Sequence, residues 1–121
     1  MIKYENLIYL NIIEYKKVLI FGKLEVLYKV KVLSKDNTYY CWKKYDDFCS
    51  IYYTLKSKNF KPTHFPKNKL FDNYYEKKYE KYNQEKMNKL NIFLNHLCHD
   101  NIPFNIYVNK YLTLIKNNIS Y

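Results

Sequence analysis

A change in hydrophobic period near the middle of the chain most constrains what it can fold into. Residues 24–33, LEVLYKVKVL, end in strict alternation of apolar residues and lysines, which is typical of a half-buried strand. Residues 34–37 are the turn-forming sequence SKDN, and residues 38–42 then form a second run rich in aromatics. This pattern predicts a β-hairpin, and therefore an antiparallel sheet.

Two further apolar runs precede the hairpin. Residues 7–13 are rich in Ile, Leu and Tyr, and residues 17–21 form a shorter run followed by Gly22, the only glycine of the chain. A glycine at that place indicates a turn, because it adopts positive φ without steric cost. We expect an antiparallel sheet of about three strands.

After residue 45 the apolar spacing becomes helical. Phe48, Tyr52 and Leu55 fall at i, i+4 and i+7 of an amphipathic helix over 46–56, with two acids in its first turn. A second, long helix is predicted over 74–97, and its apolar stripe consists of Met87, Leu90, Phe93, Leu94 and Leu97. Pro103 is placed to begin another helix, which extends to about residue 115.

These elements define an α+β fold. A three-stranded antiparallel β-meander is followed by a helical subdomain of three or more helices, and a loop over 59–73 with Pro62 and Pro66 separates the first two helices. The length of 121 residues suits a single domain over 1–121. Its core is expected over about 6–114, with a frayed tail at 117–121.

Charge and cysteine content restrict the partners and the compartment. The chain has 21 lysines, no arginine and a formal net charge of +10, which favours polyanions such as anionic membranes or nucleic acid. An AT-rich coding sequence explains an excess of Lys, Asn, Ile and Tyr equally well. Three cysteines, no signal sequence and no apolar stretch of about 20 residues predict a cytoplasmic protein whose membrane contact is peripheral.

Three separated motifs carry a family resemblance. They are KKYDDF at 43–48, the proline loop PTHFPKNKLF at 62–71, and KMNKLNIFL at 86–94. In this order and spacing the chain resembles a PX (phox-homology) domain, a phosphoinositide-binding module in which the first motif favours Arg-Arg-Tyr-Ser-x-Phe. The resemblance covers about residues 6–114.

The resemblance implies a role for each motif in binding phosphatidylinositol 3-phosphate. Lys44 matches the residue that holds the 3-phosphate, Tyr45 the aromatic that packs on the inositol ring, and Lys86 the residue that bonds the 4- and 5-hydroxyls. The neighbours of Lys44 are assigned differently from the residues alone: Trp42 is expected in the core and Lys43 in solvent.

In the proline loop the match is offset by one residue. The position of the family's 1-phosphate ligand falls on Asn68, with Lys67 and Lys69 on either side. Lys69 is preferred, because Leu70 and Phe71 follow it as the family's membrane-dipping tip would. Both lysines remain candidates.

Lysine where the family prefers arginine has a physical cost. Arginine binds a phosphate with two parallel hydrogen bonds, whereas lysine is a point charge on a flexible stem. We expect weak to moderate affinity and looser headgroup selectivity.

The sequence gives little support for an enzymatic or metal-binding function. His96, Cys98 and His99 provide at most three metal ligands at one helix end, with no matching cluster elsewhere. No nucleophile–base motif is present, and one glycine cannot make a glycine-rich phosphate loop. We predict a non-enzyme without a metal or cofactor.

The sequence suggests three candidate functions for the chain. The first is a peripheral membrane-targeting module for phosphatidylinositol 3-phosphate on the cytosolic face of endosome-like membranes, acting in membrane trafficking and protein transport. The alternative is a PX-fold protein–protein interaction domain with little headgroup selectivity. The distribution of the lysines over all elements argues against nucleic-acid binding. Headgroup selectivity, oligomeric state, protein partners and whether the chain is a domain of a longer protein stay open.

Overall fold

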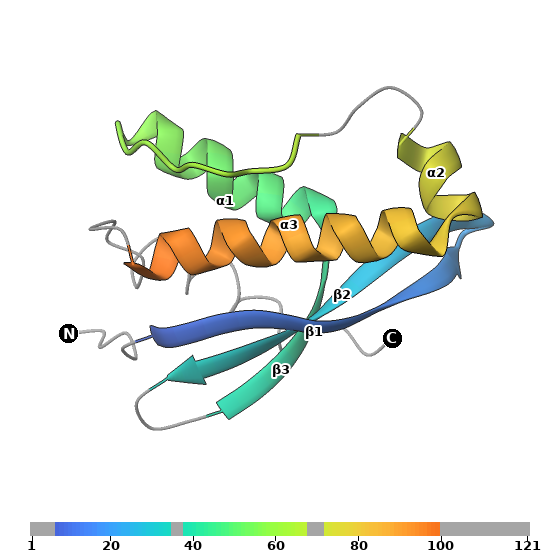
Figure 1. Cartoon of the computed structure of the whole chain (residues 1–121), viewed down its shortest axis with the longest axis horizontal. Helices are drawn as coiled ribbons and strands as arrows, with labels where there is room; N and C mark the ends of the chain where they lie inside the picture. Colours follow the sequence, from blue (N-terminus) through green and yellow to red (C-terminus); the bar gives the residue numbers. More distant parts are fainter. Residues whose placement is uncertain (1–6, 35–37, 68–71, 100–121) are drawn as a thin grey trace.

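In the described part of the chain a three-stranded sheet lies beside three helices (Figure 1). The structure is a computed structural model that describes residues 7–34, 38–67 and 72–99. In chain order the elements are β1 (Leu7–Ile20), β2 (Lys23–Ser34), β3 (Thr38–Lys44), α1 (Tyr45–Ser57), α2 (Asp72–Lys78) and α3 (Glu80–His99). This is the predicted α+β class, a β-meander followed by helices.

The sheet is antiparallel in the order β1-β2-β3. The two apolar runs predicted near the N-terminus are one long strand, β1, with a register irregularity between Ile12 and Glu14 that lets it bend without ending. The β1–β2 turn has Phe21 at φ 51° and Gly22 at φ 77°. The predicted turn before β3 falls largely on residues outside the described part, but Leu33 lies opposite Thr38, as a short connection requires.

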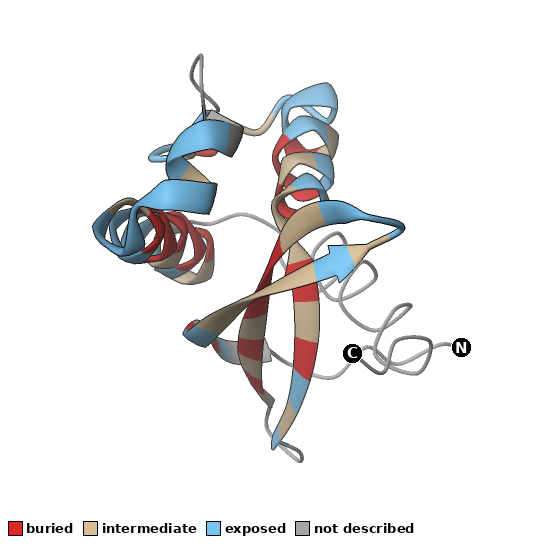
Figure 2. Cartoon of the chain, turned by 90° about the vertical axis from the view of Figure 1, so that its right-hand side faces the viewer, coloured by how far each residue is buried: buried red, intermediate tan, exposed pale blue. Residues whose placement is uncertain are grey.

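One face of the sheet packs on α1 and α3 and forms the core (Figure 2). Tyr28, Val30 and Val32 of β2 are fully buried there, as the alternation predicts. The apolar face of α1 is buried as predicted, and so is the stripe of α3; the members are Phe48, Ile51, Tyr52, Leu55, Met87, Leu90, Phe93, Leu94 and Leu97.

The end of β3 reverses two predictions. Lys43 lies opposite Tyr28 on the core face and is 1% exposed, whereas Trp42 lies opposite Lys29 on the outer face and is only half-buried. Strand alternation forces this exchange, because neighbouring side chains point to opposite faces. Trp42 is instead covered by the ammonium of Lys16, 4.3 Å from its ring centroid.

The long predicted helix is two helices, α2 and α3, divided at Tyr79. Asn83 is fully buried, and its amide Nδ2 donates to the carbonyl oxygens of Glu76 at 2.8 Å and Tyr79 at 3.2 Å. A side chain that bonds carbonyls at a helix end satisfies groups that the helix itself leaves unpaired. The prediction of continuity was therefore wrong. The helix predicted after Pro103 lies outside the described residues.

Candidate functional site

A cup opens where the sheet meets the helices. It has a volume of 140 Å³ and is bordered by the start of β2, the β3–α1 junction, α2 and α3. Its lining comprises Lys23, Leu24, Glu25, Val26, Tyr28, Lys44, Tyr45, Asp46, Glu76 and Lys86. Three of the five predicted headgroup ligands, Lys44, Tyr45 and Lys86, thus come from separate elements into one cavity.

Lys44 ends β3 and stands at the N-terminus of α1. Its main-chain N–H donates to Asp47 Oδ2 at 2.8 Å, which fixes the strand-to-helix corner. Asp46 and Asp47 lie in the first turn, where the helix dipole stabilises acids. Among the described residues the Lys44 ammonium has no hydrogen-bond or ion-pair partner, so this charge is available to a ligand.

Tyr45 is fixed by the proline loop. Its hydroxyl donates to the carbonyl oxygen of Pro66, and its ring stacks on Phe65 with centroids 5.6 Å apart. Phe65 in turn stacks on Tyr52 at 4.5 Å and meets Phe93 edge-on at 4.9 Å. The loop therefore reaches the core through Phe65, and the tyrosine ring is held as a rigid wall of the cup.

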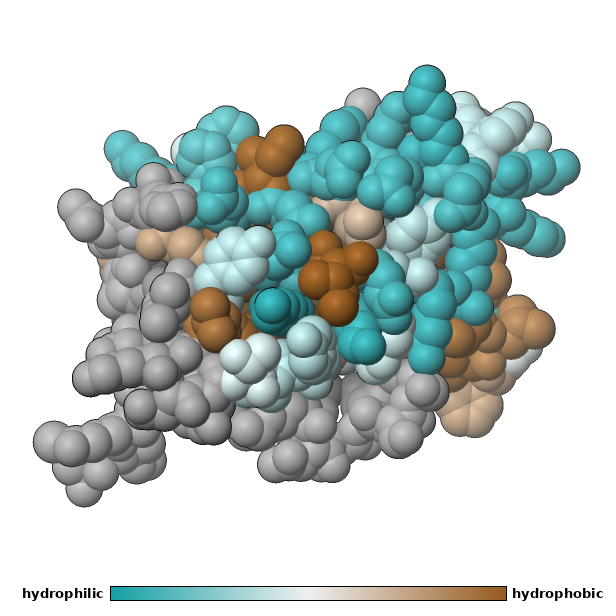
Figure 3. Space-filling view, turned by 60° about the horizontal axis from the view of Figure 1, so that its bottom comes forward, coloured by the Kyte–Doolittle hydropathy of each residue, from teal (hydrophilic) through white to brown (hydrophobic). Residues whose placement is uncertain are grey.

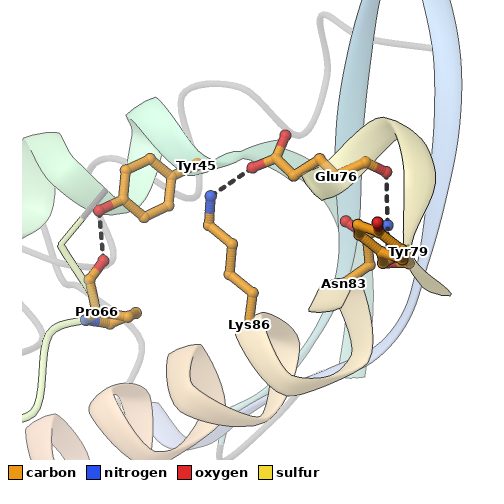
Figure 4. Close-up of polar contacts among 6 residues, drawn as sticks. All are labelled: Tyr45, Pro66, Glu76, Tyr79, Asn83 and Lys86. Carbon is orange, nitrogen blue, oxygen red and sulfur yellow. Dashed lines mark hydrogen bonds and ion pairs between the residues drawn. The ribbon is translucent and has the colours of Figure 1, made fainter. Parts of the chain in front are cut away.

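Lys86 extends from α3 between Tyr45 and Glu76 (Figure 4). Its ammonium is 2.5 Å from Glu76 Oε1 and 4.3 Å from the centroid of the Tyr45 ring. The residue is only 6% exposed. A desolvated cation held by both a carboxylate and an aromatic face has a well-defined position.

The charges of the cup balance. Three lysines line it (Lys23, Lys44 and Lys86), and so do three acids (Glu25, Asp46 and Glu76). Asp46 belongs to the first motif but was assigned only to the first turn of a helix, and neither Glu25 nor Glu76 lies in any of the three motifs. Glu76 had no usable signal at all, since the helix break that turns it towards Lys86 is invisible in the sequence.

The remaining predicted ligands and membrane contacts belong to the proline loop. Lys67 is exposed and does not line the cup. The other candidates, Lys69, Leu70 and Phe71, lie outside the described residues.

The β1–β2 turn carries a feature that sequence reasoning missed. Leu19 is 74% exposed and Phe21 is fully exposed, at 102%. Figure 3 shows hydrophobic side chains gathered at the right-hand end of the molecule, the end at which Figure 1 places this turn. A large apolar side chain held in solvent at a strained φ is unusual for a turn.

The described residues contain neither a candidate metal cluster nor a helix suited to crossing a membrane. Across residues 7–34, 38–67 and 72–99 no group of three or more His, Cys, Asp or Glu side chains could hold a metal ion. His96 stacks on His64 with ring centroids 3.9 Å apart. No helix of the described chain is long and apolar enough to cross a bilayer.

The architecture, a small sheet beside helices with a charged cup at their junction, is shared with one known domain family. The PX domain family model matches residues 31–113, and no curated protein matches the chain. The X-ray structure of a designed CISK-PX domain superposes with a TM-score of 0.70 at 15% identity, covering 88% of this chain and 96% of that one. The chain belongs to the PX domain family. PX domains are phosphoinositide-binding modules that attach peripherally to membranes and are not enzymes.

Proposed function

We propose that the chain binds phosphatidylinositol 3-phosphate and thereby attaches to the cytosolic face of endosome-like membranes, in membrane trafficking. The observation that carries this proposal is the convergence of Lys44, Tyr45 and Lys86, from three elements, on one cup. Each part of the headgroup has a matching group in the cup: a cation for the phosphomonoester, an aromatic face for the inositol ring and a polar pair for the hydroxyls.

Lys44 binds the 3-phosphate in this proposal. A phosphomonoester carries close to two negative charges, and a cationic donor is its natural partner. Tyr45 supplies a flat apolar wall for the inositol ring, with its hydroxyl engaged by Pro66 and so kept away from the ring. Lys86, whose ammonium lies beside the same tyrosine ring, meets the 4- and 5-hydroxyls.

The membrane adds two further contacts. Lys69, or Lys67 in its place, meets the 1-phosphate, while Leu70 and Phe71 enter the interface. The β1–β2 turn adds Leu19 and Phe21, and burying one such side chain contributes roughly 1.5–3 kcal/mol. Lysines near an anionic leaflet add about 1 kcal/mol each. Lys44 in place of arginine makes the cup alone a modest binder, so these terms act together.

Vesicle flotation with a panel of phosphoinositides, at near-physiological salt, tests the proposal. We expect preferential flotation with phosphatidylinositol 3-phosphate, lost in Lys44→Ala. The matched control is Lys58→Ala, an exposed lysine at the far end of α1 that removes the same charge outside the cup. Equal loss in both variants would show that only bulk charge matters.

The charge balance of the cup favours one second candidate, a protein–protein interaction domain with little headgroup selectivity. A cup with three acids attracts a polyanion less than the net charge of +10 suggests. This candidate predicts adsorption to any anionic vesicle, without headgroup preference, that added salt abolishes.

A further inference from the structure

The cup contains a carboxylate that a simple phosphate-binding site would not include. Glu76 Oε1 is 2.5 Å from the Lys86 ammonium, and the two side chains are only 16% and 7% exposed. Figure 4 shows the Glu76 carboxylate in line with the lysine, beside the Tyr45 ring. Any group that reaches Lys86 from the cup therefore also meets Glu76.

The Glu76–Lys86 pair is chemically selective. A hydroxyl group can donate to the carboxylate and accept from the ammonium at the same time. A phosphate in that place can use the ammonium, but its oxygens face a carboxylate of like charge. The pair therefore favours an unmodified hydroxyl over a phosphorylated one.

The composition of the chain does not account for this acid. The whole chain has 21 lysines against 11 acids, whereas the lining of the cup has three of each. In the proposed function one phosphomonoester is bound by the Lys44 ammonium. A second phosphate would bring about two more negative charges to a lining whose other lysines are Lys23 and Lys86, and Lys86 is already paired with Glu76.

Space acts in the same direction. The cavity of 140 Å³ is below the roughly 300 Å³ at which small-molecule sites usually begin. A second phosphate on the side of Lys86 would need space that the Glu76 carboxylate occupies.

We propose that Glu76 determines headgroup specificity, admitting headgroups with one phosphomonoester at Lys44 and rejecting those phosphorylated on the hydroxyls that face Lys86. The inference rests on the proposed function of the cup. It assigns Glu76 a discriminating role, so Glu76 is expected to lower the affinity for multiply phosphorylated lipids while leaving the preferred lipid bound.

The test compares Glu76→Gln with Glu85→Gln, which removes the same charge from an exposed position of α3 outside the cup. The vesicles contain phosphatidylinositol 3-phosphate, a bisphosphate phosphorylated at position 3 and at position 4 or 5, or the 3,4,5-trisphosphate. The content of phosphatidylserine is adjusted so that the total charge of the vesicles is constant. Soluble inositol phosphates, measured by calorimetry, separate binding in the cup from adsorption to the membrane.

In Glu76→Gln the affinity for the bisphosphates should rise by about tenfold or more, because like charges side by side are strongly unfavourable. Affinity for the monophosphate should change by less than about threefold, and all affinities of Glu85→Gln by less than about twofold, since an exposed charge contributes little. The readout is a ratio between ligands of one variant, so a partly unfolded fraction cancels.

The remaining outcomes separate the two proposals. If Lys44→Ala abolishes binding but Glu76→Gln keeps the headgroup ranking of the parent, the role of Glu76 is overturned and the function of the cup stands. If the parent binds no phosphoinositide in preference to phosphatidylserine, both proposals are overturned.

Discussion

Asn91 of α3 forms two hydrogen bonds with the main chain of Ile12 on β1. The Ile12 N–H donates to Asn91 Oδ1 at 2.6 Å, and Asn91 Nδ2 donates to the Ile12 carbonyl oxygen at 3.0 Å. The side-chain amide thus replaces one residue of a neighbouring strand at the edge of the sheet. An unpaired strand edge invites pairing with another chain, so α3 both covers this edge and aligns itself along β1.

Replacement of Asn91 by alanine should lower the free energy of unfolding by about 1–2 kcal/mol, because it leaves a part-buried N–H and C=O of Ile12 unbonded. Urea denaturation followed by circular dichroism measures the change. Asn95→Ala, an exposed site one turn further along α3, reports the gain that alanine gives at a helical position by itself. A parent-like midpoint for Asn91→Ala would contradict the assignment.

Lys43 should be replaceable by methionine with a gain in stability. Burial lowers the pKa of Lys43 below its ordinary 10.5, against the smaller opposing effects of Cys41 and Asp47. The folded state therefore carries a desolvation penalty wherever the lysine is charged in both states. We expect Lys43→Met to raise the free energy of unfolding at pH 7 by about 1 kcal/mol.

The same linkage gives a pH dependence. The penalty is complete below the lowered pKa and disappears as pH rises to 10.5, so the advantage of Lys43→Met should shrink across that window. Urea titrations at pH 7 and pH 10 measure it. Lys31→Met, on the outer face of β2, controls for removal of one positive charge. An advantage that grows with pH would refute the burial argument.

Phe21 is expected to lower the free energy of unfolding and to strengthen binding to membranes. Its φ of 51° costs an ordinary L-residue about 1–2 kcal/mol, whereas asparagine tolerates this region. Phe21→Asn should therefore raise the free energy of unfolding by about 0.5–1 kcal/mol and weaken vesicle binding by about tenfold through the lost apolar contact. Phe21→Leu keeps the apolar contact and the strain, and should change neither quantity much. Vesicle binding unaffected by Phe21→Asn would remove the turn from the membrane contact.

The thiols should be slow to react in the folded protein. Burial raises the pKa of both Cys49 and Cys98 above the ordinary 9.0. The side chain of Tyr45 and the charge of Lys86 oppose this in part at Cys49, and the main chain of Leu10 opposes it in part at Cys98. Cys41 is buried. Because the thiolate is the reactive form, labelling with a disulfide reagent at pH 7.5 should be much slower than in urea. A rapid phase of one thiol per chain would contradict this.

The periodic parts of the chain were predictable from the sequence. Alternation in β2 and the spacing of Phe48, Tyr52 and Leu55 report one buried face each, and burial of such a face dominates the stability of small elements. Motif spacing singled out Lys44, Tyr45 and Lys86, and the structure brings the three to one cup; their roles as ligands stay predictions.

The features that were not predicted depend on contacts between elements, which the types of single residues do not report. Lys43 and Trp42 were assigned by residue type, but the register of β3 against β2 decides which face each occupies. The division at Tyr79 is accompanied by hydrogen bonds from the amide of Asn83 to the carbonyls of Glu76 and Tyr79, contacts that the apolar spacing of the sequence does not report. Glu76 became visible as part of the cup only after that division was known.

The seven-residue helix α2 has a consequence for how such a domain can diverge. A helix this short is not stable alone in water. Its described contacts with α3 include the Asn83 amide bond to the Glu76 carbonyl, the Glu76–Lys86 ion pair and the ring contact of Tyr75 with Tyr82. Because Glu76 is paired with the buried Lys86, a substitution there acts on α3 as well as on the cup. If Glu76 sets the headgroup preference as proposed, a change of lipid preference through α2 is coupled to the stability of α3 and is expected to need a compensating change at Lys86.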